Sequence, residues 1–139
     1  MIQVIIVDDD PQFRQEIRAV LEGIGDCIVV GVSDNPMEVI KMAQIHSPTI
    51  VLLNGDLPAS DALEIARLLR SSVATVGIII LTQFPDEERL FQFLKVGANA
   101  YKTRTVSLEG LVEAVRRVSS GEFLFSFYSP RYEEVGSGS

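Results

Sequence analysis

Residues 51–58 read Val51-Leu52-Leu53-Asn54-Gly55-Asp56-Leu57-Pro58, an apolar run that ends abruptly in polar side chains. Pro48 precedes the run, and its short length suits a buried strand better than a helix. We therefore predict a strand over residues 49–53. Asn54 and Asp56 then follow at the carboxyl end of that strand, where the chain leaves the sheet.

Strand and helix patterns alternate on both sides of this segment. Four more short apolar runs predict strands over residues 2–7, 27–32, 76–81 and 99–101. Periodic apolar residues predict five helices, which begin at Asp10-Pro11 and Asn35-Pro36 and otherwise span residues 61–70, 86–96 and 107–118. Five strand–helix units in alternation predict an α/β fold with a parallel sheet covered by helices on both faces.

Composition limits the function classes. The chain has 139 residues, which suits one domain, and 47% of them are apolar. A net charge of -7 argues against direct binding of this segment to nucleic acid, because phosphate binding needs a basic face. The single Cys27 excludes an internal disulfide, and no apolar run reaches the roughly 20 residues of a membrane span. We expect a cytoplasmic protein.

Polar residues follow the predicted strands, and the carboxyl ends of parallel strands meet at one edge of a sheet. Carboxylates there suit Mg²⁺, and a hydroxyl beside a cation suits a phosphoryl group. Each residue also has a plainer interpretation: a helix cap, a turn residue or a solvated cation. Their joint placement favours a functional site that contains Asp8, Asp9, Asn54, Asp56, Thr82 and Arg104, whereas Asp10 is expected to act as the helix cap.

Five segments, in order and spacing, resemble the receiver domain of two-component response regulators. They are Val7-Asp8-Asp9-Asp10-Pro11-Gln12-Phe13-Arg14, the segment from Pro48 to Leu53, Leu57-Pro58 with Asp61, Leu81-Thr82, and Gly97-Ala98-Asn99-Ala100-Tyr101. The resemblance implies a flavodoxin-like doubly wound sheet with strand order 2-1-3-4-5. It covers residues 2 to 121, so we expect a receiver domain over 1–121 and a linker or tail over 122–139.

The resemblance also assigns roles to single residues. Asp9 matches the direct Mg²⁺ ligand, and Asp8 matches an acid that acts through water. Thr82 matches the hydroxyl that grips a phosphoryl oxygen, and Tyr101 matches the aromatic residue that swings inward with that hydroxyl. The family's phosphoacceptor stands four residues before the proline of the third loop, which is Asn54 here. The family's lysine stands three residues after the aromatic, which is Arg104 here.

These two departures change the expected chemistry. An amide is a far poorer nucleophile than a carboxylate and offers Mg²⁺ no charge, so Asn54 should prevent ordinary phosphorylation and weaken Mg²⁺ binding. Arginine keeps the positive charge of lysine but presents a planar fork. We predict that Arg104 reaches Asp8, Asp9 or Asp56 as a salt-bridged latch.

Two rescue routes are open at the sequence level. Asp56 is an alternative phosphate acceptor, but about 6.6 Å of extended chain separates it from position 54. The dipeptide Asn54-Gly55 is prone to deamidation, which would convert the amide into an acid.

The leading interpretation is an atypical receiver domain that controls transcription through an attached DNA-binding domain. Gly121-Glu122 and Ser129-Pro130 resemble the linker that leads to a helix-turn-helix domain in LuxR/NarL-type regulators. The alternative is a stand-alone interaction module that works without phosphorylation. An enzyme, a phosphotransferase that uses Asp8 or Asp9, ranks last because no glycine-rich phosphate loop is present.

The expected partners are proteins: a sensor kinase or another regulator, and a second copy of this chain. The dimer would form through the helix over 86–96, the strand over 99–101 and the helix over 107–118, or through the first and last helices. DNA would be bound only by a domain outside this chain. Of Phe91 and Phe93 we expect one to pack in the core, and Leu108 should lie on the buried face of its helix.

Overall fold

The computed structural model describes residues 1–57 and 62–125, and these contain the five predicted strands. All pair in parallel in the order β2-β1-β3-β4-β5, which confirms the flavodoxin-like α/β fold. The strands are β1 Ile2–Val7, β2 Cys27–Ser33, β3 Ile50–Asn54, β4 Gly77–Thr82 and β5 Ala100–Thr103. Pro58, Asp61 and the tail beyond residue 125 lie outside the described residues.

One helix follows each strand, and the predicted caps begin the first two. The Asp10 carboxylate accepts from the backbone N–H groups of Gln12 and Phe13, and the Asn35 side chain caps the second helix in the same way. Proline occupies the first helical position in both, where no N–H is needed. The helices are α1 Pro11–Gly23, α2 Pro36–His46, α3 Ala62–Ser72, α4 Glu87–Lys95 and α5 Leu108–Ser119.

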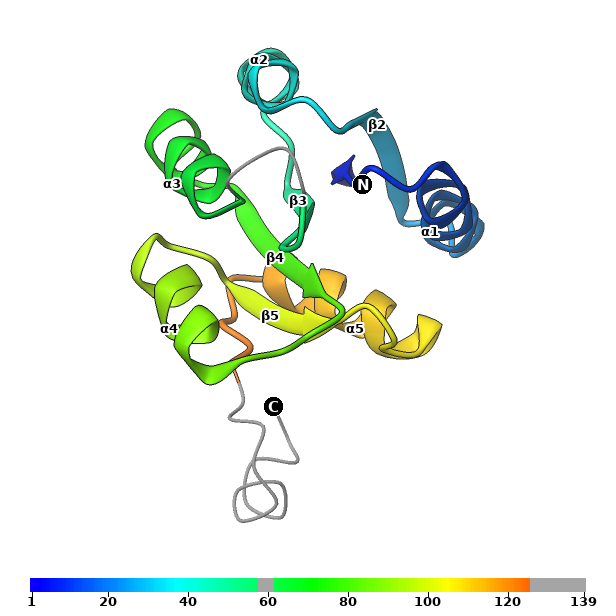
Figure 1. Cartoon of the computed structure of the whole chain (residues 1–139). Coiled ribbons are helices and arrows are strands. Elements are labelled where there is room, and N and C mark those ends of the chain that lie inside the picture. Colours follow the sequence, from blue (N-terminus) through cyan, green and yellow to red (C-terminus); the bar gives the residue numbers. More distant parts are fainter. Residues whose placement is uncertain (58–61, 126–139) are drawn as a thin grey trace.

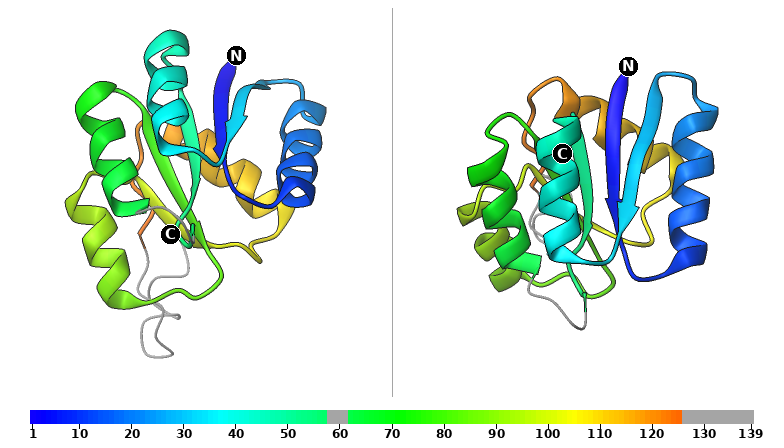
Figure 2. Two further views of the ribbon diagram at one scale, coloured as in Figure 1. Left: turned by 45° about the horizontal axis from the view of Figure 1, so that its top comes forward. Right: turned by 90° about the horizontal axis from the view of Figure 1, so that it is seen from above.

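The sheet lies between two helical layers, with α1 and α5 on one face and α2, α3 and α4 on the other (Figures 1 and 2). Alternate residues of β3 face the two layers: Val51 and Leu53 pack toward α2 and α3, whereas Ile50 and Leu52 pack toward α5. Each fully buried aliphatic side chain of this kind contributes about 1.5–3 kcal/mol. Two cores therefore hold the central strands rigidly in place.

Two predictions about single side chains had different outcomes. Phe93 is fully buried and Phe91 is 43% exposed, so one of the pair packs in the core as expected. The prediction for Leu108 was wrong, since this residue is 54% exposed. Leu108 is the first residue of α5, and the buried face of that helix begins only at Leu111.

After α5 the chain returns to the sheet edge. The Leu124 backbone N–H donates to the Asn99 carbonyl at 2.7 Å, and Leu124 forms a parallel bridge with Ala100. Leu124 is buried beside α5, and Phe125 packs on the core of the opposite face. The exit segment therefore covers the start of the outer edge of β5.

Candidate functional site

The ends of four parallel strands bring the predicted polar residues to one edge of the sheet. Asp8 follows β1 directly, Asn54 and Thr82 are the last residues of β3 and β4, and Arg104 follows β5. The Arg104 backbone N–H donates to the Thr82 carbonyl at 2.8 Å, which fixes the path of the chain after β5. We call this edge, with Asp8, Asp9, Asn54, Asp56, Thr82 and Arg104, the rim.

Asp8 and Arg104 form the most buried ion pair of the rim. Arg104 Nη1 lies 2.6 Å from Asp8 Oδ2, and only 12% of the arginine side chain is exposed. The same guanidinium stacks over the Phe13 ring at 3.9 Å and lies 3.8 Å from the Asp10 carboxylate. Of the three acids that we expected Arg104 to reach, it therefore reaches Asp8. A planar guanidinium suits this position because it can stack on the ring and donate to the acid together.

Burial raises the pKa of Asp8 above its ordinary value. Two contacts oppose that rise: the Asp10 backbone N–H donates to Asp8 Oδ1 at 2.9 Å, and the Arg104 charge lies close by. The neighbouring Asp9 carboxylate raises the pKa further. Asp8 thus depends on Arg104 for much of the stabilisation of its charged form.

Asn54 lies beside Asp9 and complements it. The Asn54 Nδ2 group donates to Asp9 Oδ1 at 3.2 Å, and Asn54 Oδ1 accepts from the Asp56 backbone N–H at 2.8 Å. The reverse amide orientation would place oxygen against the carboxylate and NH₂ against the backbone N–H, so these neighbours fix the orientation. A carboxylate at position 54 could not donate to Asp9.

Asp56 contacts the end of β4. The Thr82 hydroxyl donates to Asp56 Oδ1 at 2.7 Å, and the Gln83 backbone N–H donates to Oδ2 at 2.7 Å. Both oxygens of this carboxylate are thus bound, one by the last residue of β4 and the other by the first residue of the β4–α4 loop.

Tyr101 points inward and is buried against α4. Its hydroxyl accepts from the backbone N–H of Asp86, the cap residue of α4, at 3.2 Å. Its ring centroid lies 5.9 Å from that of Phe93. Burial raises the pKa of the Tyr101 hydroxyl, so it stays neutral well beyond physiological pH.

Three contacts of the rim were missed by sequence reasoning. They come from the Phe13 ring under Arg104, the Gln83 backbone N–H on Asp56, and Arg89, whose Nη2 donates to the Gly55 carbonyl at 2.7 Å. Phe13 and Arg89 lie on the helices that follow β1 and β4. Their helical spacing showed only that Phe13 belongs to an apolar face, and a backbone N–H has no side-chain signature.

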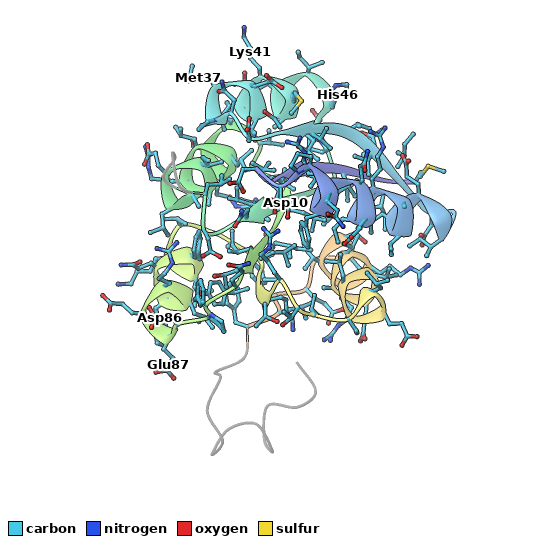
Figure 3. The ribbon with its side chains drawn as sticks, turned by 45° about the vertical axis from the view of Figure 1, so that its right-hand side comes forward. Asp10, Met37, Lys41, His46, Asp86 and Glu87 are labelled. Carbon is cyan, nitrogen blue, oxygen red and sulfur yellow. The ribbon has the colours of Figure 1, made fainter. Side chains whose placement is uncertain are left out.

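The rim residues do not fit a Mg²⁺ site of several carboxylates. Asp8 already binds a guanidinium, and position 54 presents an amide nitrogen to Asp9. Within residues 1–57 and 62–125, no group of three or more His, Cys, Asp and Glu side chains is arranged to hold a metal ion. Cys27 is buried in the core, and His46 lies on the outside of α2, remote from the labelled Asp10 and Asp86 (Figure 3).

The chain matches a known protein family and several known proteins. The family model of the response regulator receiver domain matches residues 4–116. The transcriptional regulatory protein LnrK of Bacillus subtilis is 31% identical over 121 residues, which cover 87% of this chain and 55% of LnrK. The nitrate/nitrite response regulator protein NarL of Escherichia coli K12 is 27% identical over 123 residues, which cover 88% of this chain and 57% of NarL.

A solved structure shows the same fold. The LuxR-family two-component response regulator from Aurantimonas sp. SI85-9A1 superposes with a TM-score of 0.84 at 23% identity, covering 98% of this chain and 95% of that one. The chain belongs to the response regulator receiver domain family and is related to the NarL/LuxR transcription regulators. This family is not a family of catalytic enzymes, in agreement with the low rank given above to the phosphotransferase alternative. The chain spans about half the length of these curated relatives.

Replacing Arg104 with Gln should lower the free energy of unfolding by about 3 kcal/mol, because it leaves the buried Asp8 charge without a cation. Chemical denaturation measures this. Arg18→Gln is the matched control, since it removes an exposed pair with Glu22 and should cost about 0.5 kcal/mol or less. Equal losses in the two variants would contradict the importance of the buried pair.

The same variant should change the pH dependence of stability. Since the folded pKa of Asp8 is raised, the folded protein binds this proton more tightly than the unfolded chain does. The bound proton on Asp8 therefore stabilises the folded state. This contribution is present below the ordinary carboxyl pKa and is lost as pH rises through the folded pKa of Asp8. Arg104→Gln should move that loss to higher pH, which carboxyl NMR titration of Asp8 measures; an unmoved titration would contradict the role of Arg104.

Proposed function

We propose that this chain is an atypical receiver domain that signals without phosphorylation of its own rim. The observation that carries the proposal is Asn54 at the end of β3, hydrogen-bonded to Asp9 at the position that corresponds to the family's phosphoacceptor. The amide oxygen of Asn54 is a weak nucleophile. The amide nitrogen of Asn54 already donates to Asp9, the acid that would otherwise bind the metal. The cation that corresponds to the family's lysine, Arg104, is bound to Asp8.

Mg²⁺ binding is weakened for the same reason. Receiver domains typically bind Mg²⁺ among their rim acids. Here the ion would have to displace Arg104 from Asp8 and turn the Asn54 amide. In return it would find few free carboxylates to neutralise its charge. No step of the proposed function depends on the metal.

Asp56 is a poor substitute for the acceptor. Both of its oxygens are bound to donors at the end of β4. Phosphorylation at Asp56 would require both bonds to break first. We therefore group Asp56 with the residues that the resemblance assigns to phosphate binding and switching, which are Thr82, Tyr101 and Arg104.

The relatives favour a role in transcription. LnrK and NarL carry the names of a transcriptional regulator and a response regulator, and this chain matches about half of each. We place the receiver domain at residues 1–121 and propose that residues 122–139 lead to a DNA-binding domain. DNA would be bound only by that domain, in the cytoplasm. The alternative is a stand-alone interaction module, and a helix-turn-helix segment in the full-length product would exclude it.

Among the helices of residues 1–57 and 62–125, none has the length and apolar character that a membrane-spanning helix needs.

The partner proteins would be a sensor kinase or another regulator, and a second copy of the chain. A hollow between α1 and α5 is lined by Val20, Ile24, Leu108 and Val112. Along α5, Glu109 and Glu113 precede Arg116 and Arg117, so two antiparallel copies of this helix would place acids against bases. The exit segment covers the start of the β5 edge, which favours the α1–α5 dimer over one through α4, β5 and α5.

Replacing Leu108 with Glu should shift this dimer to monomer, because it places a charge in the apolar centre of the proposed contact. Sedimentation of the wild-type protein and the variant measures the effect, as an at least tenfold weaker association. Met37→Glu is the matched control, since Met37 is exposed on α2 (Figure 3). A monomeric wild-type protein, or equal association of wild type and Leu108→Glu, would contradict this dimer.

Acetyl phosphate with Mg²⁺ should add no phosphoryl group to the wild-type protein, because neither Asn54 nor Asp56 presents a free carboxylate to the donor. Intact mass measures this directly. A peptide map in the same experiment shows whether the amide at position 54 is intact. Stoichiometric phosphate on protein with an intact amide would refute the proposed function.

A further inference from the structure

The carboxylate of Asp56 is bound through both oxygens, to a hydroxyl and to a backbone N–H. Thr82 is fully buried, whereas Asp56 is exposed, so fixed donors meet a carboxylate that reaches in from the surface. Each of the two bonds is 2.7 Å long, which is typical of charge-assisted hydrogen bonds. A hydroxyl and a backbone N–H held side by side form a cradle for one small oxyanion. We call Thr82 Oγ1 and the Gln83 N–H the oxyanion cradle.

We propose that Asp56 is the built-in anion of this cradle and that it holds the β4–α4 loop in one conformation without any bound ligand. This inference rests on the proposed function, since a domain that takes no phosphoryl group needs another anion for these donors. The chemical class that the cradle would accept in place of Asp56 is a small oxyanion, either a carboxylate or a phosphate.

The main chain around Asp56 is pinned, so the carboxylate is directed at the cradle. The Asp56 N–H donates to Asn54 Oδ1 at 2.8 Å, and the Gly55 N–H donates to the Leu81 carbonyl at 2.8 Å. A Cβ at Gly55 would lie 2.9 Å from Ile80 Cγ2, so the close approach of this loop to β4 requires glycine. Asn54 thereby orients two acids: it donates to Asp9 and accepts from Asp56.

Contacts beyond the cradle connect Asp56 to the start of α4. Thr82 Oγ1 accepts from the Phe84 N–H at 3.2 Å while it donates to Asp56. Arg89 on α4 donates to the Gly55 carbonyl of the same loop as Asp56. Phe84 is 75% exposed in this conformation, while Tyr101 is buried and bound to the α4 cap. A change at Asp56 should therefore reach the whole β4–α4 loop.

Asp56→Asn tests the proposal, because it keeps the shape of the side chain but removes the negative charge, so that neither cradle bond is charge-assisted any longer. We expect the Gln83 amide to exchange with deuterium at least about tenfold faster than in the wild type. The amide NMR signals of Gln83, Phe84 and Asp86 should shift with it. Asp34→Asn makes the same chemical change on an exposed acid after β2, and it should leave these signals unchanged.

Asp56→Ala empties the cradle and allows a chemical rescue. Formate and inorganic phosphate, added separately, should slow the exchange of the Gln83 amide in this variant and have no such effect on the wild type. Rescue by formate alone restricts the cradle to carboxylates, and rescue by both extends it to phosphates; both results support the proposal. Failure of both anions to slow the exchange overturns the cradle.

Three further results are decisive. Gln83 exchange in Asp56→Asn that equals the wild-type rate overturns the proposal. If neither variant folds, the wild-type protein decides, since a Gln83 amide that exchanges like an unstructured peptide also overturns it. Phosphate uptake by the wild-type chain contradicts the proposed function instead, because the Gln83 exchange rates do not depend on acetyl phosphate.

Discussion

The carboxylate of Asp8 is almost completely withdrawn from water, and its charge must be compensated by a group that the fold brings to it. Parallel strands create this constraint, since β1 ends where β3, β4 and β5 also end and their side chains converge on one small volume. Arg104 meets the requirement from the end of β5, with Phe13 below its guanidinium. The ion pair therefore links the two strand ends that flank the site.

The other acids of the rim follow the same principle on a smaller scale. Asp9 receives a hydrogen bond from the Asn54 amide, and Asp56 receives two bonds from Thr82 and Gln83. Each contact joins a different pair of strand ends or loops, and together they hold the rim in one arrangement. The chain's own side chains and the Gln83 backbone N–H supply this cohesion.

Much of this was predictable from the sequence because the responsible patterns are local. Capping residues followed by proline located α1 and α2, and short apolar runs located the strands. The alternation of strands and helices then required the candidate residues to meet at one edge. The sequence could not decide which of three acids, Asp8, Asp9 or Asp56, Arg104 would bind, because that depends on non-local geometry. Leu108 illustrates another limit, because helical spacing does not show where the supporting sheet ends.

If the rim residues satisfy one another without a ligand, a Mg²⁺ titration followed by thermal unfolding will show it. Mg²⁺ should shift the wild-type Tm no more than a monovalent salt of equal ionic strength does. Asn54→Asp, which sets a carboxylate where the amide nitrogen lies 3.2 Å from Asp9, should be destabilised and then rescued by Mg²⁺. Asn35→Asp, the same change at a helix cap, should show no Mg²⁺ dependence. Saturable stabilisation of the wild-type protein by Mg²⁺ would mean that the rim binds the metal and is not held together by its own contacts alone.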